Sequence, residues 1–308
     1  MRKGFLIIFS FFYLFAGSGK YGSERFEFGY SARVQGKGCA FIAGEDDITA
    51  TFLNPAILSS INSLKIEASY STYYGGILSS GSFNLCLPNK ENTFGISLFF
   101  IQVPKIPHTY SLDPDSVDNF DDIILKGYFN SYTYCFNFNF SKKIRNFDFG
   151  LNTKLFYEDI LNENGKGVGF DIGILKKINE NTKFGVSILN LFGTYFIWTT
   201  GKKEVFNPLL NTGFSFNLFK NLLINFDFSI KTENIKNSSF FNISFLSLHP
   251  RLGFEWNLFK FLNLRGGLEE SFPCFGFGFI FKGLLLDYAL RYSFDLGDSH
   301  IVTLSYKR

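Results

Sequence analysis

Apolar and polar side chains alternate residue by residue along most of this 308-residue chain. The clearest run is 131–141, SYTYCFNFNFS, where Tyr and Phe take every second position from Tyr132 to Phe140 and mainly polar residues take the others. Because successive side chains of a β-strand point to opposite sides, such a strand has one aromatic face and one polar face. The same pattern recurs in 222–232 and 284–293, and it predicts an all-β protein.

About fourteen such segments follow one another, and no linker divides the chain. They are 64–74, 79–87, 93–103, 127–140, 147–158, 166–176, 183–191, 208–218, 222–232, 243–258, 261–270, 275–282, 284–293 and 300–307. Strands with large apolar side chains on one face suit a transmembrane antiparallel β-barrel of about 14 strands, which has lipid outside and a polar lumen. A soluble β-sandwich would also alternate, but the repetition and length of the segments favour the barrel.

The connections between segments also alternate in length. Links such as 142–146 and 177–182 are short, whereas the predicted loops 104–126, 192–207 and 233–242 are longer. Outer-membrane barrels have short periplasmic turns and long external loops. An even number of strands therefore puts both chain ends on the periplasmic side.

Composition excludes several other classes of protein. Phe alone supplies 43 residues and aromatics make up 19 % of the chain, yet mean hydropathy is only +0.08. A helical membrane protein would gather its apolar residues into runs of about 18 or more. The formal net charge of +3 comes with no basic block, which argues against a nucleic-acid surface. The scattered cysteines predict no metal or redox site, and the absence of hydrolase motifs predicts neither an enzyme nor a cofactor.

The N-terminus has the layout of a secretory signal peptide. Arg2 and Lys3 precede an apolar run at 5–15, and small residues follow at 16–19. Eleven residues span roughly 16 Å as a helix, about half a bilayer core, so a permanent helical anchor is the weaker alternative. We therefore expect residues 1–19 to direct export to the cell outer membrane.

Residues 20–62 precede the first alternating segment and are predicted to form a plug inside the barrel of residues 63–308. Their candidate structural or gating residues are Gly36, Gly38, Asp46, Asp47, Asn54 and Pro55. The glycines permit tight turns and a close approach to the wall, and Asp47 suits the positive end of a short helix. Asn54 before Pro55 suits either a turn or a helix N-cap with proline at the first helical position.

The segment Ser31–Leu58 resembles the N-terminal motif of the PorV/PorQ family of outer-membrane proteins, relatives of the FadL-type long-chain fatty-acid transporters. The pattern is present as Ala32-Arg33, Gly36-Lys37-Gly38-Cys39-Ala40, Ala43-Gly44-Glu45-Asp46-Asp47 and Asn54-Pro55-Ala56. The resemblance implies a 14-stranded barrel with an N-terminal hatch. It also implies either passage of hydrophobic small molecules or a part in a protein-secretion system.

Charged residues on the polar faces are expected to point into the lumen, because Arg or Lys facing lipid costs roughly 2–4 kcal/mol at the midplane. They are Asp148, Lys154, Glu158, Asp171, Asp227, Lys231, Arg251, Glu255, Arg265, Glu269, Asp287 and Arg291. Ion pairs that tie the plug to the wall are one role for them, and lining a substrate path is the other. Leu175, Leu189, Leu223 and Leu285 share their side of the strands, so parts of the interior are expected to be apolar.

Three functions remain open from the sequence. The first is a conduit for hydrophobic small molecules. The second is a barrel component or cargo shuttle of a type IX-like protein-secretion system that acts through its loops. The third is a structural barrel without transport. The expected partners are outer-membrane lipid and the barrel-assembly machinery, with hydrophobic solutes or secretion proteins according to function.

Overall fold

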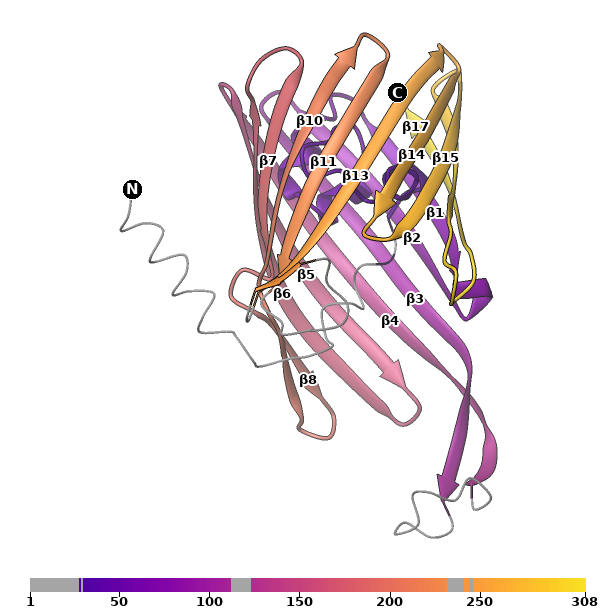
Figure 1. Cartoon of the computed structure of the whole chain (residues 1–308). Coiled ribbons are helices and arrows are strands. Elements are labelled where there is room, and N and C mark those ends of the chain that lie inside the picture. The colour runs from indigo at the N-terminus through magenta and orange to yellow at the C-terminus, as the bar shows by residue number, and fades with distance from the viewer. Residues whose placement is uncertain (1–27, 29, 112–122, 232–240, 244–245) are drawn as a thin grey trace.

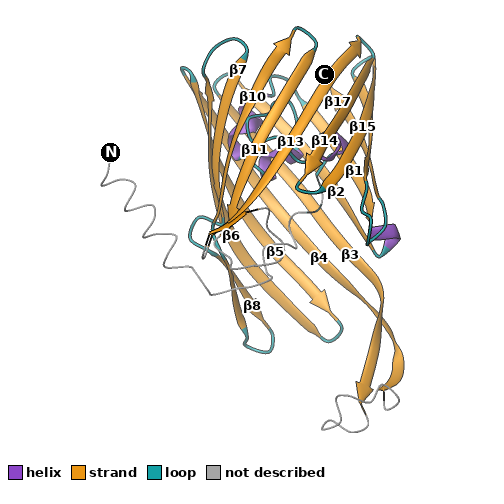
Figure 2. Ribbon diagram, in the orientation of Figure 1, coloured by secondary structure: helices purple, strands orange, loops and turns teal. Residues whose placement is uncertain are grey.

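The structure is a computed structural model that describes residues 28, 30–111, 123–231, 241–243 and 246–308. The expected signal peptide lies outside these residues. Figures 1 and 2 show an antiparallel barrel with short helices inside it. In the part of the chain that the structure describes, no helix is long and apolar enough to cross a bilayer.

Four short helices and seventeen strands make up the described fold. The helices are α2 (Ala32–Gly36), η2 (Thr49–Phe52), η3 (Pro55–Ser60) and η4 (Tyr74–Gly76). The strands are β1 (Lys65–Tyr73), β2 (Leu78–Asn89), β3 (Asn92–Ser111), β4 (Ile123–Ile144), β5 (Phe147–Ile160), β6 (Glu163–Lys177), β7 (Thr182–Leu189), β8 (Thr194–Trp198), β9 (Lys203–Phe206), β10 (Leu209–Phe219), β11 (Leu222–Lys231), β12 (Phe241–Ile243), β13 (Leu246–Phe259), β14 (Leu262–Glu269), β15 (Phe272–Phe281), β16 (Leu284–Arg291) and β17 (Ser299–Lys307).

Fourteen of these strands close the ring, which confirms the predicted barrel. They are β1–β7, β10, β11 and β13–β17, and each coincides with one predicted segment. The ring closes where β1 pairs with β17, from Lys65 opposite Lys307 to Thr72 opposite His300. The other three strands are appendages: β8 pairs with β6 and carries β9, while β12 pairs with β13.

The predicted orientation of the strand faces is confirmed. On β4, Phe136 and Phe138 are 47 % and 48 % exposed, whereas Asn137 and Asn139 are buried inside the barrel. Large apolar side chains on most other strands are likewise exposed on the outside. The aromatic faces thus form the outer surface of the ring, and the polar faces form its lumen.

The prediction of loops was wrong for two segments, which contain β-strands. The 104–126 loop is largely β structure, because β3 and β4 continue as a paired ribbon to Ser111 opposite Ile123. Proline is typical of loops, but Pro104 lies at a register shift, and a free-standing ribbon tolerates proline. The 192–207 loop contains the β8–β9 hairpin, which buries Phe196 and Phe206. The predicted 233–242 loop lies almost wholly outside the described residues.

The plug occupies the lumen near the end of the barrel where the chain terminates (Figure 1). Helix α2 packs on β14–β17, and η3 packs on β3–β6. Almost every side chain between Tyr30 and Ile61 is buried or half-buried. The plug therefore spans the lumen from one side of the wall to the other.

Glycines of the wall face the plug around much of the ring. They are Gly95, Gly150, Gly173, Gly185, Gly213, Gly253, Gly267 and Gly276. Several are neighbours across strands, such as Gly253 opposite Gly267. A methyl group on Gly150 would overlap the backbone of Pro55 and Ala56, and one on Gly253 would overlap the carbonyl of Lys37. The plug backbone thus lies directly on the wall backbone.

We expect Gly150→Ala to destabilise the folded barrel by about 1–3 kcal/mol, as overpacking of a tight interface does. The overlap is with backbone atoms of the plug, which cannot rotate away. Urea unfolding in lipid vesicles measures the loss. The matched control is Gly266→Ala, whose methyl group meets only the Phe254 ring, 2.5 Å away, and this side chain is able to turn outward. Equal stability of the two variants would contradict direct backbone contact at Gly150.

Candidate functional site

The plug is shaped by local caps that its sequence provides. Ser31 caps α2, and its hydroxyl accepts a hydrogen bond from the Val34 amide at 3.2 Å. Gly38 follows in the left-handed region at φ +59°, where an added Cβ would lie 2.6 Å from the Leu268 carbonyl carbon. Asn54 caps η3 and accepts from the Ala56 amide at 3.1 Å, with Pro55 at the first helical position. Of the two roles predicted for Asn54, a turn or a helix N-cap, the structure shows the N-cap.

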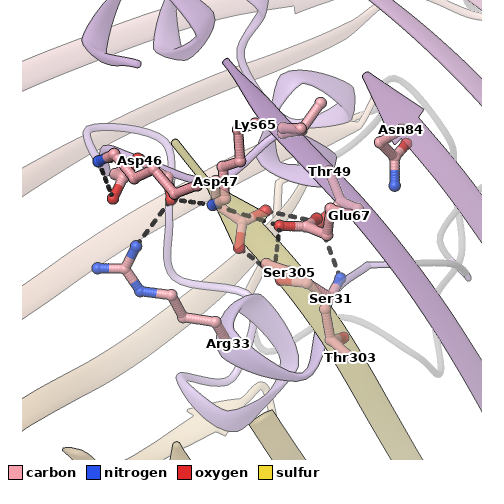
Figure 3. A network of polar contacts seen from close by, with 12 residues as sticks. Ser31, Arg33, Asp46, Asp47, Thr49, Lys65, Glu67, Asn84, Thr303 and Ser305 are labelled. Carbon is pink, nitrogen blue, oxygen red and sulfur yellow. Dashed lines mark hydrogen bonds and ion pairs between the residues drawn. The ribbon is translucent and has the colours of Figure 1, made fainter. Parts of the chain in front are cut away.

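Asp47 organises the interior of the plug (Figure 3). Its carboxylate accepts hydrogen bonds from the Ser31 hydroxyl at 2.6 Å, the Thr49 hydroxyl at 2.8 Å and the Ala50 amide at 3.1 Å. Because these partners lie on both sides of Asp47 in the sequence, the carboxylate joins α2 to η2. Asp47 is 1 % exposed, and all of these bonds stay within the plug.

Asp46 instead joins the plug to the seam of the barrel. Its carboxylate forms an ion pair with Lys307 at 3.0 Å, and its carbonyl accepts a hydrogen bond from Lys65 at 2.7 Å. Lys65 also pairs with Glu67 at 3.3 Å, and Glu67 accepts from Ser305 at 3.1 Å. Figure 3 shows Lys65, Glu67 and Ser305 beside the two aspartates. The two adjacent aspartates therefore have different contacts, one internal and one to the wall.

A chain of buried ion pairs fastens α2 to the wall on which it packs. The Arg33 guanidinium donates to both oxygens of Glu255, at 2.8 and 2.9 Å. Glu255 also accepts from Arg265 at 2.7 Å, and Arg265 pairs with Asp287 at 2.6 Å. Arg33 further donates to the carbonyls of Glu45 and Asp46. One guanidinium thus joins two plug segments and strands β13, β14 and β16.

Other predicted lumen charges contact the plug or one another. The Asp227 carboxylate accepts from the Ile42 amide at 2.8 Å, and Glu269 accepts from Gln35 and Arg291 at 3.1 and 2.8 Å. Lys154 pairs with Asp171 at 2.7 Å. Glu158, Lys231 and Arg251 are buried and also have partners, while Asp148 is half-buried near the short turns. Most of the predicted charges therefore contact the plug or pair with one another.

Lys37 is an exception in this network because it has no close carboxylate partner in the described structure. Its ammonium group lies 3.7 Å from the centre of the Phe41 ring and donates to Asn225 at 3.3 Å. Burial lowers the pKa of Lys37 to about 7. Only the Phe41 ring and the Asn225 amide therefore offset the loss of water from the Lys37 ammonium group.

An apolar cavity lies on the side of the plug that faces the long ribbon. The space within it that is wide enough for a water molecule is about 40 Å³. Its apolar lining includes Phe28, Phe52, Phe99, Phe156, Leu189 and Leu209, while Lys154, Asn190, Asn211 and Arg251 supply polar groups. A mostly apolar wall with a few polar groups is the usual form of a small-molecule site.

Only part of the lining of this cavity could be predicted from the sequence. Leu189 was expected inside, and Phe156 has the same strand phase as Lys154 and Glu158, so the alternation contained its signal. Phe99 lies in the unbroken apolar run LFFI at 98–101, where no alternation marks the inner face. Among the described residues, no cluster of His, Cys, Asp or Glu has the arrangement of a metal site.

No family model matches the chain, and no curated protein matches it in sequence. Solved structures share its fold. The toluene transporter TodX of P. putida is 13 % identical with a TM-score of 0.66, over 91 % of this chain and 99 % of that one. The toluene transporter TbuX of Ralstonia pickettii is 10 % identical with a TM-score of 0.62, over 91 % and 98 %. A Pseudomonas aeruginosa FadL homologue is 12 % identical with a TM-score of 0.57, over 91 % and 99 %. The fold is therefore a FadL-type barrel of fourteen strands with a segment before the barrel. The closer resemblance to PorV/PorQ proteins stays a prediction.

We expect Arg33 and Glu255 to be energetically coupled. A double-mutant cycle with Arg33→Met and Glu255→Met should give a coupling free energy of unfolding of about 1–3 kcal/mol, because both groups lose water on burial. The control is the pair Lys202–Glu204, 3.2 Å apart, in which Lys202 is exposed and Glu204 half-buried, with an expected coupling of about 0–1 kcal/mol. A coupling at Arg33–Glu255 no larger than at the control pair would show that this ion pair does not hold the plug.

Proposed function

We propose that the protein is an outer-membrane channel that admits hydrophobic small molecules and that the plug controls their passage. The observation that carries the proposal is the apolar cavity between the plug and the ribbon end of the barrel. The inward cluster of Phe99, Phe156, Phe196 and Phe206 is distinct from the apolar cluster inside the plug, and two of its members, Phe99 and Phe156, line this cavity. The FadL-type fold supports the same function, since solved relatives of this shape are described as toluene transporters.

In this proposal, outer-membrane lipid covers the aromatic exterior, and the barrel-assembly machinery inserts the chain after export. The short turns face the periplasm, and the β3–β4 ribbon faces outward. A solute enters from the ribbon side and binds between Phe52 of the plug and Phe99, Phe156 and Leu189 of the wall. Lys154 and Arg251 lie at the edge of this space and orient any polar end of the solute.

The plug blocks the path beyond the cavity. Its ion pairs, capped helices and backbone contacts are distributed over both sides of the wall, so no single contact holds it. Passage then needs a local rearrangement of the plug. In this proposal, the polar residues named above hold the plug in place, and the apolar residues of the cavity contact the solute.

A second candidate function is a barrel component of a protein-secretion system. The observation that favours it is the β3–β4 ribbon, which carries exposed Leu125 and Tyr128 at 49 % and 66 %. A two-stranded ribbon is marginally stable alone, so a partner on its open edges would stabilise it. Purification of the barrel alone from its native membrane, after mild cross-linking, would contradict this function.

We expect Leu189→Trp to weaken binding of a neutral apolar probe such as N-phenylnaphthylamine by roughly tenfold, because the indole fills the cavity. Fluorescence titration of the protein in nanodiscs measures the affinity. The control is Val168→Trp, on the exterior of β6, where the side chain is 38 % exposed. Equal affinities for the two variants, or no binding by the native chain, would contradict the channel and leave the second candidate.

A further inference from the structure

Positive charge recurs around the end of the barrel where the strands are joined by short turns (Figure 1). Each of the six short turns has at least one exposed Lys or Arg in the turn or at the strand ends beside it, and so does the end of β17. We call these residues the cationic rim, and they are Lys90, Lys143, Arg145, Lys176, Lys177, Lys220, Lys260, Lys282 and Arg308. Because all fourteen strands of the ring begin or end here, the cationic rim surrounds the barrel.

Neighbouring carboxylates do not balance the charge of the cationic rim. The short turns contain only two exposed acidic side chains, Glu91 and Glu180. In the described part of the chain, no residue of the rim belongs to an ion pair, and the pairs near this end involve Lys65, Lys183 and Lys307 instead. The rim therefore presents a net positive charge to whatever surrounds this end of the barrel.

The opposite end of the barrel has the reverse balance of charge. Its described connections, with the β8–β9 hairpin, contain two lysines, Lys202 and Lys203. They are outnumbered by four acidic residues, which are Glu204, Glu270, Asp295 and Asp298. The positive charge is thus a property of one end and not of the whole barrel.

Large apolar side chains lie directly beside the cations. A Phe-Lys dipeptide occurs in three of the short turns, as Phe219-Lys220, Phe259-Lys260 and Phe281-Lys282. The three Phe side chains are 65 %, 54 % and 67 % exposed. They continue the outer apolar surface of the ring up to the level of the charges.

Two cations of the rim lie over the outer surface of the barrel. The Lys282 ammonium group is 5.4 Å from the centre of the Phe281 ring, and the Lys176 ammonium group is 5.1 Å from the centre of the Phe147 ring. Both rings are exposed on the outside. The charges therefore lie where the apolar exterior meets water, and not over the lumen.

The chemistry of this surface fits a phospholipid better than a soluble protein. A phospholipid has a phosphate directly above its acyl chains, so one molecule contacts both a cation of the rim and the Phe ring below it. Lys and Arg at a membrane surface attract anionic lipids, and this attraction adds up over neighbouring charges. A soluble acidic protein would contact the turns but would leave the outward Phe rings uncovered.

We propose that the cationic rim binds a ring of anionic phospholipids such as phosphatidylglycerol. Their phosphates pair with the rim, and their acyl chains cover the adjacent Phe rings. The short turns accordingly face the phospholipid leaflet of the membrane. The inference rests on the lipid-covered exterior of the proposed function, but it does not require that any solute passes through the barrel.

The test uses the full chain in nanodiscs of equal parts phosphatidylcholine and phosphatidylglycerol, and native mass spectrometry counts the lipids that the protein retains. The rim variant carries Lys220→Gln, Lys260→Gln and Lys282→Gln. Its matched control carries Lys105→Gln, Lys166→Gln and Lys203→Gln, three exposed lysines toward the opposite end, so both variants lose the same charge. Because all six side chains are exposed, both variants should fold, and the heat-dependent shift of the folded band on gels verifies this.

We expect the native chain to retain phosphatidylglycerol in preference to phosphatidylcholine, and the rim variant to retain roughly threefold less phosphatidylglycerol, because three of the attracting charges are lost. The control variant should retain as much as the native chain. High salt should reduce the native preference, since salt screens exposed charges. Equal retention of the two lipids by the native chain, or equal loss in the two variants, would overturn the proposal.

A second lipid identifies the leaflet. Lipid A also carries phosphates, so nanodiscs that contain it in place of phosphatidylglycerol test the other anionic lipid of an outer membrane. Lipid A retained by the native chain through the rim lysines, with no retention of phosphatidylglycerol, would overturn the assignment of this end to the phospholipid leaflet.

The binding of N-phenylnaphthylamine separates this proposal from the channel. The rim variant should bind the probe as the native chain does, because the rim lies outside the apolar cavity. If the native chain does not bind the probe but retains phosphatidylglycerol through the rim, the channel is wrong and the lipid site stands. If the probe binds while the native chain shows no lipid preference, the lipid site is wrong and the channel stands.

Discussion

Backbone-to-backbone contact between plug and wall is the constraint on which the rest of the structure depends. The lumen of a fourteen-stranded ring is filled here by a chain of only about thirty residues, Tyr30–Ile61, that lies flat against the strands. Such contact is possible only where the wall has no side chain, as at Gly150, Gly185 and Gly253. The glycines of β5, β7 and β13 therefore set where the plug lies, and the paired charges then fix its orientation.

Polar pairing inside the lumen follows from that packing. A plug seated against bare backbone removes water from Glu255, Asp227 and Arg265, and each would be costly without a partner. Arg33 and the Ile42 amide supply partners to Glu255 and Asp227 from the plug side, while Arg265 pairs with Glu255 and Asp287 of the wall. The apolar cavity begins where the plug ends and where inward positions change from charged residues to Phe99 and Phe156. The lumen thus has two regions, one in which charged wall side chains surround the plug and one lined largely by Phe and Leu side chains.

The fourteen strands of the ring could be predicted almost completely, because the alternation that marks a strand is a local property of the sequence. Every second residue of a strand meets either lipid or the lumen, and this period-two pattern is visible without any tertiary information. The β3–β4 ribbon escaped prediction because Pro104 and Pro107 are typical loop residues, although a bulge and a free edge accommodate them. The inward charges were found by phase, and so was Leu189.

The ion-pair partners of the charged side chains could not be predicted from the sequence. That Arg33 meets Glu255 across 222 positions, or that Asp46 meets Lys307, depends on how the plug lies and not on any short spacing. The sequence also does not show that Asp47 bonds within the plug while Asp46 contacts the wall, because the two are adjacent residues of the same type. A polar cavity at the short-turn end of the barrel likewise brings together residues from within 44–62, 143–148 and 175–183, which have no pattern in common.

The seam between the first and last strands has a consequence for biogenesis. Asp46 is held by Lys307 and the Ala32 amide by Thr303, and both partners lie on β17, the last strand to be synthesised. The plug is made first, yet these contacts do not exist until β17 has joined β1. Closing the ring and locking the plug are therefore one event, so an unclosed assembly intermediate holds its N-terminal segment less firmly than the finished protein does.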